Sequence, residues 1–318
     1  MFDKLEEYYA TLEINASPKT VKSYKWILDN FVTYYDIKTV RDVNKLDSKT
    51  IQEYLNMLAT KNIETNEALF KAGKMDEKTC KRKVDTAKAS ANANARVIKV
   101  FLNWLESKKY IGTTPFTKDI KKFKEAKVLK EFFDAKERDQ IILACQDKLW
   151  LQVTMALLFY TGMRRAEIVN LRVSDFHDDH VTVLRKGNIE QDLYFPQFVT
   201  RLIKRYLRKR KDDCEYLLVG IRTHGQISEI SLGNRVKEAC RLAGIDKERA
   251  ENVTAHSIRR SFACILFLEG KSTLAIQNCL NHSSSTVTEL YVAPAKALMT
   301  GQIMAGQKNP DWYKEEED

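Results

Sequence analysis

The chain has 318 residues, more than a single domain usually has, and its hydrophobic content of 44% is ordinary for a globular protein, so two domains are expected. Its formal charge of +10 favours a polyanionic partner. No apolar run approaches the about 18 residues that span a membrane, and the six cysteines show no zinc-ligand spacing. These features predict a cytoplasmic protein with no membrane partner and no bound metal.

Residues 1–120 are predicted to form a small helical domain, because apolar side chains recur there at helical spacing and glycine is nearly absent. Ser17 and Pro18 fit the cap and the first residue of the second helix. The lysine-rich stretch 61–88 is less regular. Residues 121–130 lie in a second lysine-rich stretch, after a Gly-Thr-Thr-Pro sequence that breaks the helical pattern, and are predicted to be a basic linker.

Residues 131–318 are predicted to form a second, mainly helical domain with one small β-hairpin. Asp134 with Glu137 resembles a capping box, and the apolar residues 149–160 indicate a buried helix that stops at Gly162. Two strands are expected on either side of a turn, at Val181-Thr182-Val183-Leu184 and Leu193-Tyr194-Phe195 around Lys186-Gly187-Asn188. Further helices are expected at residues 197–210, 232–243, 256–269 and 272–280.

Two segments of this domain offer cations for an anionic group. Glu167 lies three residues after Arg164, just past the buried helix, and can pair with it or orient it. His256 and Arg259 are spaced i, i+3, which places both on one side of a helix N-terminus, where the dipole favours an anion. Taken alone, the first segment is better explained as a surface ion pair, and the second slightly better as a capping histidine beside a solvated arginine.

Two later segments add a histidine and a tyrosine, and the first of them is by itself only a turn. His282 follows an apolar helix in a short polar turn, and Tyr291 lies nine residues later. Cleaving a phosphodiester without a metal requires cations on the nonbridging oxygens, a nucleophile in line and an acid for the leaving oxygen. The chain therefore carries every residue type that this chemistry needs, although a single tyrosine is more often a core residue.

In this order and spacing the residues resemble the tyrosine recombinase family, the phage integrases and Xer-like enzymes. The match consists of a TGxRxxE segment, a hairpin lysine, HxxR, a histidine before two serines and a tyrosine nine residues later, which places the catalytic residues at Arg164, Lys186, His256, Arg259, His282 and Tyr291. The resemblance implies a clamp on double-stranded DNA, made of a helical core-binding domain and a catalytic domain. It also implies site-specific recombination in a homotetramer on two DNA sites, without a metal, ATP or another cofactor.

The resemblance further implies a role for each residue. Arg164 and Arg259 would hold the scissile phosphate, and Tyr291 would become joined to its 3′ side. His256 and His282 would complete the cradle and assist proton movement, and Lys186 would be the general acid on the departing 5′ oxygen.

Some residues depart from the family pattern. Asn281 replaces the usual glycine, and asparagine also tolerates a left-handed turn. Arg260 replaces a histidine and would either contact the phosphate or point away. The hairpin that contains Lys186 lacks the later basic residues common in the family. Glu167 and Asp175 are interpreted as structural support.

Two other functions fit the residues less well. A type IB topoisomerase shares the chemistry, but the helical N-terminal domain argues against it, and a DNA-binding protein without activity would not need every catalytic residue type. The sequence leaves open the target site and the use of accessory proteins. It also leaves open whether residues 294–306 pack on a neighbouring subunit or on their own domain.

Overall fold

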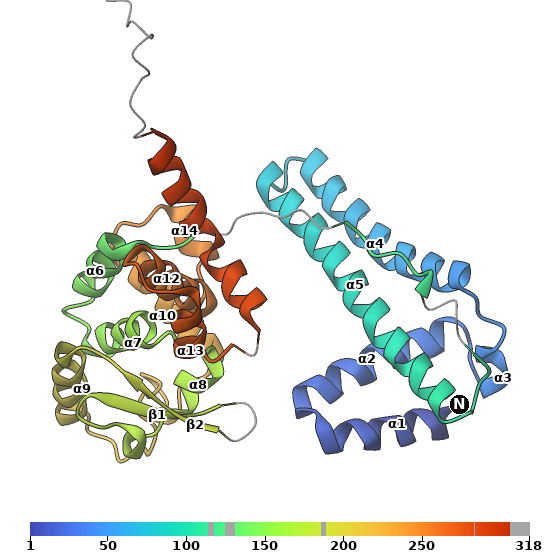
Figure 1. The fold of residues 1–318 in the computed structure, drawn as a ribbon, viewed down its shortest axis with the longest axis horizontal. Helices are drawn as coiled ribbons and strands as arrows, with labels where there is room; N and C mark the ends of the chain where they lie inside the picture. The colour runs from blue at the N-terminus through green and yellow to red at the C-terminus, as the bar shows by residue number, and fades with distance from the viewer. Residues whose placement is uncertain (114–117, 125–130, 186–188, 283, 306–318) are drawn as a thin grey trace, which may run out of the picture. The chain divides into compact units, whose positions relative to one another are not determined.

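The computed structural model describes residues 1–113, 118–124, 131–185, 189–282 and 284–305. The chain divides into two compact units, Met1–Val128 and Leu129–Asp318 (Figure 1). Both units are mainly helical, and the described residues of the second also form a two-stranded antiparallel sheet, so the predicted fold class is confirmed. The predicted linker at residues 121–130 stays a prediction, because residues 125–130 lie outside the described part of the chain.

The first unit is built from helices whose starts are set by polar caps. Ser17 accepts a hydrogen bond from the Thr20 backbone N at 3.2 Å, with Pro18 in the first helical turn, as the sequence predicts. Asp47 and Asp76 cap two later helices in the same way. The helices are α1 (Phe2–Asn15), α2 (Pro18–Tyr34), α3 (Val40–Val43), α4 (Ser48–Lys71) and α5 (Glu77–Ser107).

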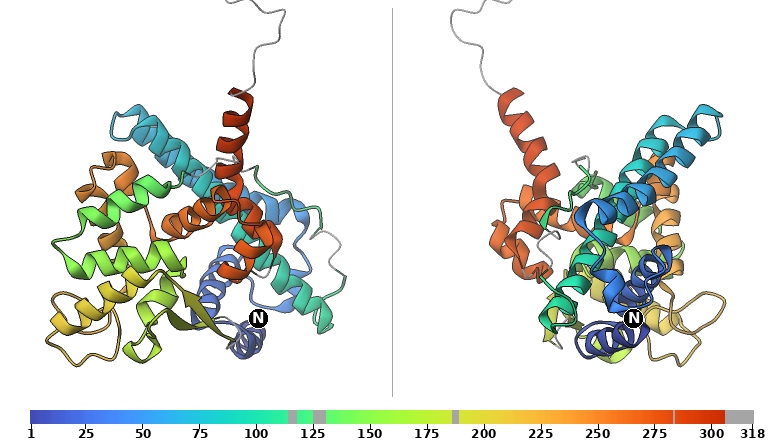
Figure 2. Two further views of the ribbon diagram at one scale, coloured as in Figure 1. Left: turned by 60° about the vertical axis from the view of Figure 1, so that its left-hand side comes forward. Right: turned by 90° about the vertical axis from the view of Figure 1, so that its right-hand side faces the viewer.

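Residues 61–88, where the sequence pattern is less regular, are helical at 61–71 and 77–88. Helix α4 continues to Lys71 and α5 begins at Glu77, so the two run side by side as a long helical hairpin (Figure 2). The small side chains of Cys80, Ala87 and Ala91 are buried at relative exposures of 6%, 6% and 1%, which lets the two helices approach closely. The exposed lysines of this stretch lie on the solvent side, where they do not disturb a helix; they are Lys61, Lys71, Lys74, Lys81 and Lys83.

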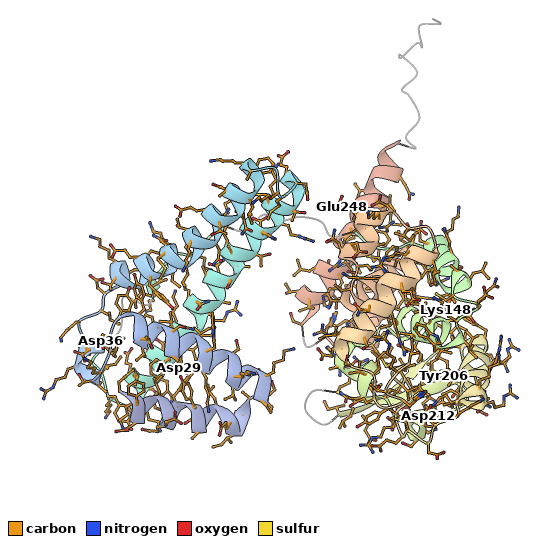
Figure 3. The ribbon with its side chains drawn as sticks, turned by 180° about the vertical axis from the view of Figure 1, so that it is seen from behind. Asp29, Asp36, Lys148, Tyr206, Asp212 and Glu248 are labelled. Carbon is orange, nitrogen blue, oxygen red and sulfur yellow. The ribbon has the colours of Figure 1, made fainter. Side chains whose placement is uncertain are left out.

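The core of the first unit is rich in aromatic side chains. Tyr8 packs against Phe101 and Trp104, with ring centroids 5.1 Å apart in both pairs. The hydroxyl of Tyr9 on α1 donates to Asp29 at 2.8 Å. Asp29 lies on α2 (Figure 3). Apolar packing and this polar contact together fix α1 against α2 and α5.

The second unit consists of helices packed around one apolar helix, and its first helix begins at a polar cap. The predicted capping box is present: Asp134 accepts from the Glu137 backbone N at 2.8 Å, and the Glu137 side chain accepts from the Asp134 backbone N at 3.0 Å. The helices are α6 (Ala135–Ala144), α7 (Leu149–Thr161), α8 (Arg165–Asn170), α9 (Gln197–Lys209), α10 (Glu229–Leu242), α11 (Lys247–Asn252), α12 (Ala255–Leu268), α13 (Thr273–Leu280) and α14 (Ser285–Ala305).

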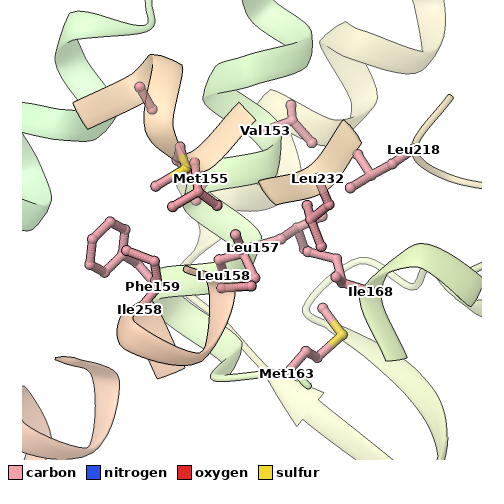
Figure 4. Close-up of a cluster of buried hydrophobic side chains, with 14 of the residues drawn as sticks. Val153, Met155, Leu157, Leu158, Phe159, Met163, Ile168, Leu218, Leu232 and Ile258 are labelled. Carbon is pink, nitrogen blue, oxygen red and sulfur yellow. The ribbon is translucent and has the colours of Figure 1, made fainter. Parts of the chain in front are cut away.

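Helix α7 is buried nearly all round, as predicted. Figure 4 shows Leu157 and Leu158 of α7 in one cluster with Ile168 of α8 and Ile258 of α12, and all four side chains are fully buried. Helix α7 therefore holds the starts of α8 and α12 at fixed positions, and these are the places where the candidate arginines occur.

The predicted hairpin is also present, as β1 (His180–Arg185) and β2 (Ile189–Tyr194). Val183 pairs with Gln191 and Arg185 pairs with Ile189 in an antiparallel register. Alternate residues of β1 face the core, since Val181, Val183 and Arg185 are buried. The turn residues 186–188, which include Lys186, lie outside the described part of the chain.

Helix α14 contains Tyr291 and continues through the segment predicted to begin at Pro294. Pro294 has no backbone N–H to donate within the helix, yet the helix runs on to Ala305. Leu298 and Met299 are exposed at 45% and 42%. Packing of this segment on a neighbouring subunit stays a prediction, and residue 306 lies outside the described residues.

We expect Gly162→Ala to lower the free energy of unfolding by about 2 kcal/mol or more, because it adds a clash to a left-handed backbone. Gly162 ends α7 with φ +58°, and a Cβ there would lie 2.5 Å from Cδ1 of Phe262. Gly244 has φ +70° but no neighbour within 4 Å, so Gly244→Ala should cost only about 1 kcal/mol. Urea denaturation measures both, and equal losses would show that Phe262 moves aside freely.

Candidate active site

The structure brings five of the six predicted catalytic residues together around the N-terminus of α12. Helix α12 contacts α7, α13 and α14, so the segments that follow α7 and α13 meet Tyr291 of α14 there. The residues brought together are Arg164, His256, Arg259, His282 and Tyr291. Lys186 lies outside the described residues, so the structure does not place it.

The arginines gather on the carbonyl oxygens at the C-terminal end of α13. Arg259 is 1% exposed, and its Nη2 donates to the Leu280 carbonyl at 2.6 Å while its Nη1 donates to the Gly162 carbonyl at 2.6 Å. Arg164 donates from Nη2 to the Asn281 carbonyl at 3.1 Å. A helix C-terminus carries partial negative charge, which holds both guanidinium groups in place.

Glu167 is the carboxylate of this cluster, and its predicted pairing with Arg164 is confirmed. It accepts from the Arg164 backbone N and from Arg164 Nη1, each at 2.7 Å. One of its oxygens also lies 4.0 Å from Arg259 Nη1. Burial opposes ionisation, but the hydrogen bonds from Arg164 and the charge of Arg185 hold the pKa of Glu167 below its usual value. The acid is therefore ionised and orients the arginines.

Arg185, which was not among the predicted site residues, joins this cluster. It is 3% exposed, donates from Nη1 to the Leu280 carbonyl at 2.6 Å, and its Nε lies 4.0 Å from Glu167. The sequence carried a signal for this position: Arg185 continues the alternation of Val181 and Val183, so its side chain had to face inward. With Arg185 the cluster holds three guanidinium groups and one carboxylate, an excess of positive charge that suits an anion.

Tyr291 and His256 form a direct polar pair. The Tyr291 hydroxyl lies 2.9 Å from His256 Nε2, and the two rings meet edge to face with centroids 5.2 Å apart. Which group donates depends on the histidine tautomer. Helices α12 and α14 position the pair, because α14 packs along α12. This geometry allows an imidazole to accept the proton of a phenol.

His282 is buried beside this pair. Its Nδ1 lies 2.9 Å from the Thr288 hydroxyl, and its ring centroid is 4.8 Å from that of Tyr291. Burial, and after it the charges of Arg259, Arg164 and Arg185, lower the pKa of His282 to about 4. At neutral pH the ring is therefore uncharged. It can donate one hydrogen bond and accept another without adding positive charge to the site.

The turn before His282 has the conformation expected for asparagine. Asn281 ends α13 in the left-handed region, with φ 47° and ψ 58°. The His282 backbone N donates to the Gln277 carbonyl at 3.1 Å, and Gln277 Nε2 donates to the His282 carbonyl at 3.0 Å. These two bonds fix the imidazole at the end of the helix.

Other residues considered from the sequence lie outside the cluster. Arg260 is 7% exposed and donates to the Glu131 carbonyl at 3.3 Å, so of its two predicted alternatives the structure favours the one in which it points away. Arg165 pairs with Glu229 at 2.5 Å. Asp175 accepts from the Arg172 backbone N at 2.8 Å and so supports a turn.

Two negative findings concern the described residues alone. No group of three or more histidine, cysteine, aspartate or glutamate side chains among them is placed to hold a metal ion. Nor does any helix in that part of the chain have both the length and the apolar character to cross a membrane.

We expect the free energy of unfolding to fall as the pH drops from about 6.5 toward 4, because the unfolded His282 binds a proton there and the buried one does not. The contribution of His282 to this loss should reach at most about 3 kcal/mol. The contribution should disappear in His282→Gln. It should persist in His177→Gln, because His177 is exposed in the unchanged protein. Urea denaturation at a series of pH values tests this, and an unaltered pH dependence in His282→Gln would contradict a neutral His282.

Comparisons with known proteins agree with this arrangement. The model of the phage integrase family matches residues 131–297. The tyrosine recombinase XerA of Pyrococcus furiosus is 34% identical over 151 residues, which cover 46% of this chain but only about half (51%) of the relative. The tyrosine recombinase XerD of Halalkalibacterium halodurans is 24% identical over 306 residues, which cover 92% of both chains.

A solved structure shares the fold. The lambda integrase tetramer bound to a Holliday junction superposes with a TM-score of 0.62 at 16% identity, over 91% of this chain and 76% of that one. Because the family model covers more than half of the chain, including both arginine motifs, both histidines and Tyr291, this protein belongs to the phage integrase family of tyrosine recombinases.

Proposed function

We propose that this protein is a site-specific DNA recombinase that cleaves and rejoins DNA through a 3′-phosphotyrosyl intermediate at Tyr291. The observation that carries the proposal is the 2.9 Å contact between the Tyr291 hydroxyl and His256, at the edge of a cluster of three arginines. A phenol beside a base and next to excess positive charge is suited to attack a phosphodiester.

In the first step the Tyr291 oxygen attacks the scissile phosphorus, and His256 accepts the phenolic proton. The bond from phosphorus to the 5′ oxygen breaks, and that oxygen takes a proton from Lys186. The products are a phosphotyrosyl bond on the 3′ side and a free 5′ hydroxyl. The 5′ hydroxyl of another strand then attacks the phosphotyrosyl bond, so the energy of the phosphodiester is conserved and no nucleotide cofactor is consumed.

Charge on the nonbridging oxygens is the main demand of the transition state. The Arg164 side chain is 42% exposed, so it can turn from the Asn281 carbonyl to a bound phosphate. Burial and the neighbouring charge of Arg164 lower the pKa of Arg259 to about 10, which leaves it charged at neutral pH. The hydrogen bonds of Arg259 to carbonyls preorganise that charge before DNA binds.

Double-stranded DNA is the proposed partner, and a homotetramer on two DNA sites is the proposed working assembly in the cytoplasm. Support comes from the solved lambda integrase, which is a tetramer on a Holliday junction and has the same fold. The helical first unit would act as the core-binding domain. Exposed basic residues on α9, namely Arg201, Lys204, Arg205, Arg208 and Lys209, suit a phosphate backbone.

Tyr291→Phe should abolish the covalent protein–DNA adduct on a nicked substrate while leaving DNA affinity and folding intact, because only the attacking oxygen is lost. Denaturing gel electrophoresis detects the adduct, which should form equally in EDTA. Tyr206→Phe is the matched control, because Tyr206 is a buried tyrosine of α9 (Figure 3). An adduct that survives in Tyr291→Phe would assign the nucleophile elsewhere, and relaxation of supercoils without strand exchange would indicate a topoisomerase.

Lys186→Ala should cleave normal DNA slowly and recover on a substrate whose 5′ bridging oxygen is replaced by sulfur, because a thiolate leaves without a proton. Arg164→Ala should recover much less, since the sulfur does not replace charge on the nonbridging oxygens. Single-turnover cleavage of both substrates measures the two effects. Equal failure of Lys186→Ala on both would remove Lys186 as the general acid.

A further inference from the structure

The guanidinium group of Arg185 connects the end of strand β1 to the end of helix α13. Its Nη1 donates to the Leu280 carbonyl at 2.6 Å, and its Nη2 reaches the Cys279 carbonyl at 3.5 Å. The side chain is fully buried at 0% exposure. Residues about 95 positions apart in the sequence are thereby held together by one side chain.

A second contact from the same hairpin reaches the same helix end. Gln191 on β2 donates from Nε2 to the Asn278 carbonyl at 3.1 Å. Gln191 pairs across the sheet with Val183, two residues before Arg185. Three successive carbonyls of α13, those of Asn278, Cys279 and Leu280, are thus bound by one side chain from each strand.

Packing alone does not explain an arginine at this position. Burial lowers the pKa of Arg185, its Nε has no hydrogen-bond partner, and the nearest carboxylate oxygen, on Glu167, is 4.0 Å away. An apolar side chain of similar length would fill the space without this desolvation cost. Methionine, for example, would fill the space, but it has no N–H groups to donate to the α13 carbonyls.

We infer that Arg185 is a positioning residue that, together with Gln191, fixes the hairpin to the turn bearing Asn281 and His282. Arg185 is the last residue of β1, and Lys186 follows it directly in the sequence. The contact therefore sets where the chain leaves the strand toward the proposed general acid, relative to the arginines that would hold the phosphate. This inference rests on the proposed function.

The matched variants are Arg185→Met and Gln191→Met, which remove the donors and keep a similar side-chain length. Gln191→Met leaves the charge of the site unchanged, so it separates the effect of the contact from the effect of the Arg185 charge. It also remains available as a test of the contact if Arg185→Met does not fold. The control is Arg172→Met, which removes an exposed arginine that pairs with Glu215.

Hydrogen–deuterium exchange of the full chain without DNA tests the contact itself. In both variants the backbone amides of β1, β2 and the last turn of α13 should exchange faster than in the unchanged protein. Amides elsewhere should exchange at the same rate as in the unchanged protein. Arg172→Met should leave these segments unaltered. Unaltered exchange in Arg185→Met and Gln191→Met would overturn the inference, whether or not Lys186 is the general acid.

Single-turnover cleavage tests the consequence for the reaction. Arg185→Met should cleave normal DNA about tenfold to hundredfold more slowly, the effect of a small displacement of a catalytic group, and should recover most of that loss on the 5′ sulfur substrate. Gln191→Met should show a smaller loss with the same recovery. Equal loss on both substrates, or a loss in Arg185→Met alone, would overturn a positioning role and leave charge or folding as the cause.

The two measurements keep this inference separate from the proposed function. If the unchanged protein forms no adduct, or if Lys186→Ala is not rescued by sulfur, the proposed function or its general acid fails, and the positioning role fails with it. The exchange experiment still decides whether the hairpin is fastened to α13.

Discussion

The end of helix α13, held by three guanidinium groups, is the interaction on which the rest of the site depends. The Leu280 carbonyl accepts from both Arg185 and Arg259, and the next carbonyl accepts from Arg164. These arginines come from β1, from α12 and from the junction of α7 with α8. The partial negative charge of one helix end thereby joins four parts of the chain that are distant in sequence.

The same cluster sets the electrostatics of the neighbouring residues. Glu167 stays ionised among the arginines, whereas His282, buried beside them, stays neutral. The remaining excess of positive charge is held in place by peptide carbonyls, which are weaker acceptors than a phosphate oxygen. An anionic ligand can therefore replace some of these contacts without reorganising the site, which is the condition for electrostatic catalysis.

Much of the second unit could be predicted from the sequence, because the signals are local. Asp134 with Glu137 caps α6, Gly162 ends α7 in a left-handed conformation, and Asn281 does the same for α13. The order and spacing of the motifs also named the residues that the structure gathers. The sequence pattern of residues 61–88 is weak because lysines signal solvent exposure, whereas Cys80 and Ala87, which are buried there, are small.

The sequence by itself determined most of the long helices, the hairpin, the turn residues and the candidate set from Arg164 to Tyr291, because periodicity and backbone sterics act between near neighbours. Only the tertiary structure decided which charged side chains face the site. Arg185 enters it and Arg260 turns to the Glu131 carbonyl, although both are arginines in or beside a motif. Their directions depend on carbonyls about 95 and 129 residues away, and no local rule specifies such contacts.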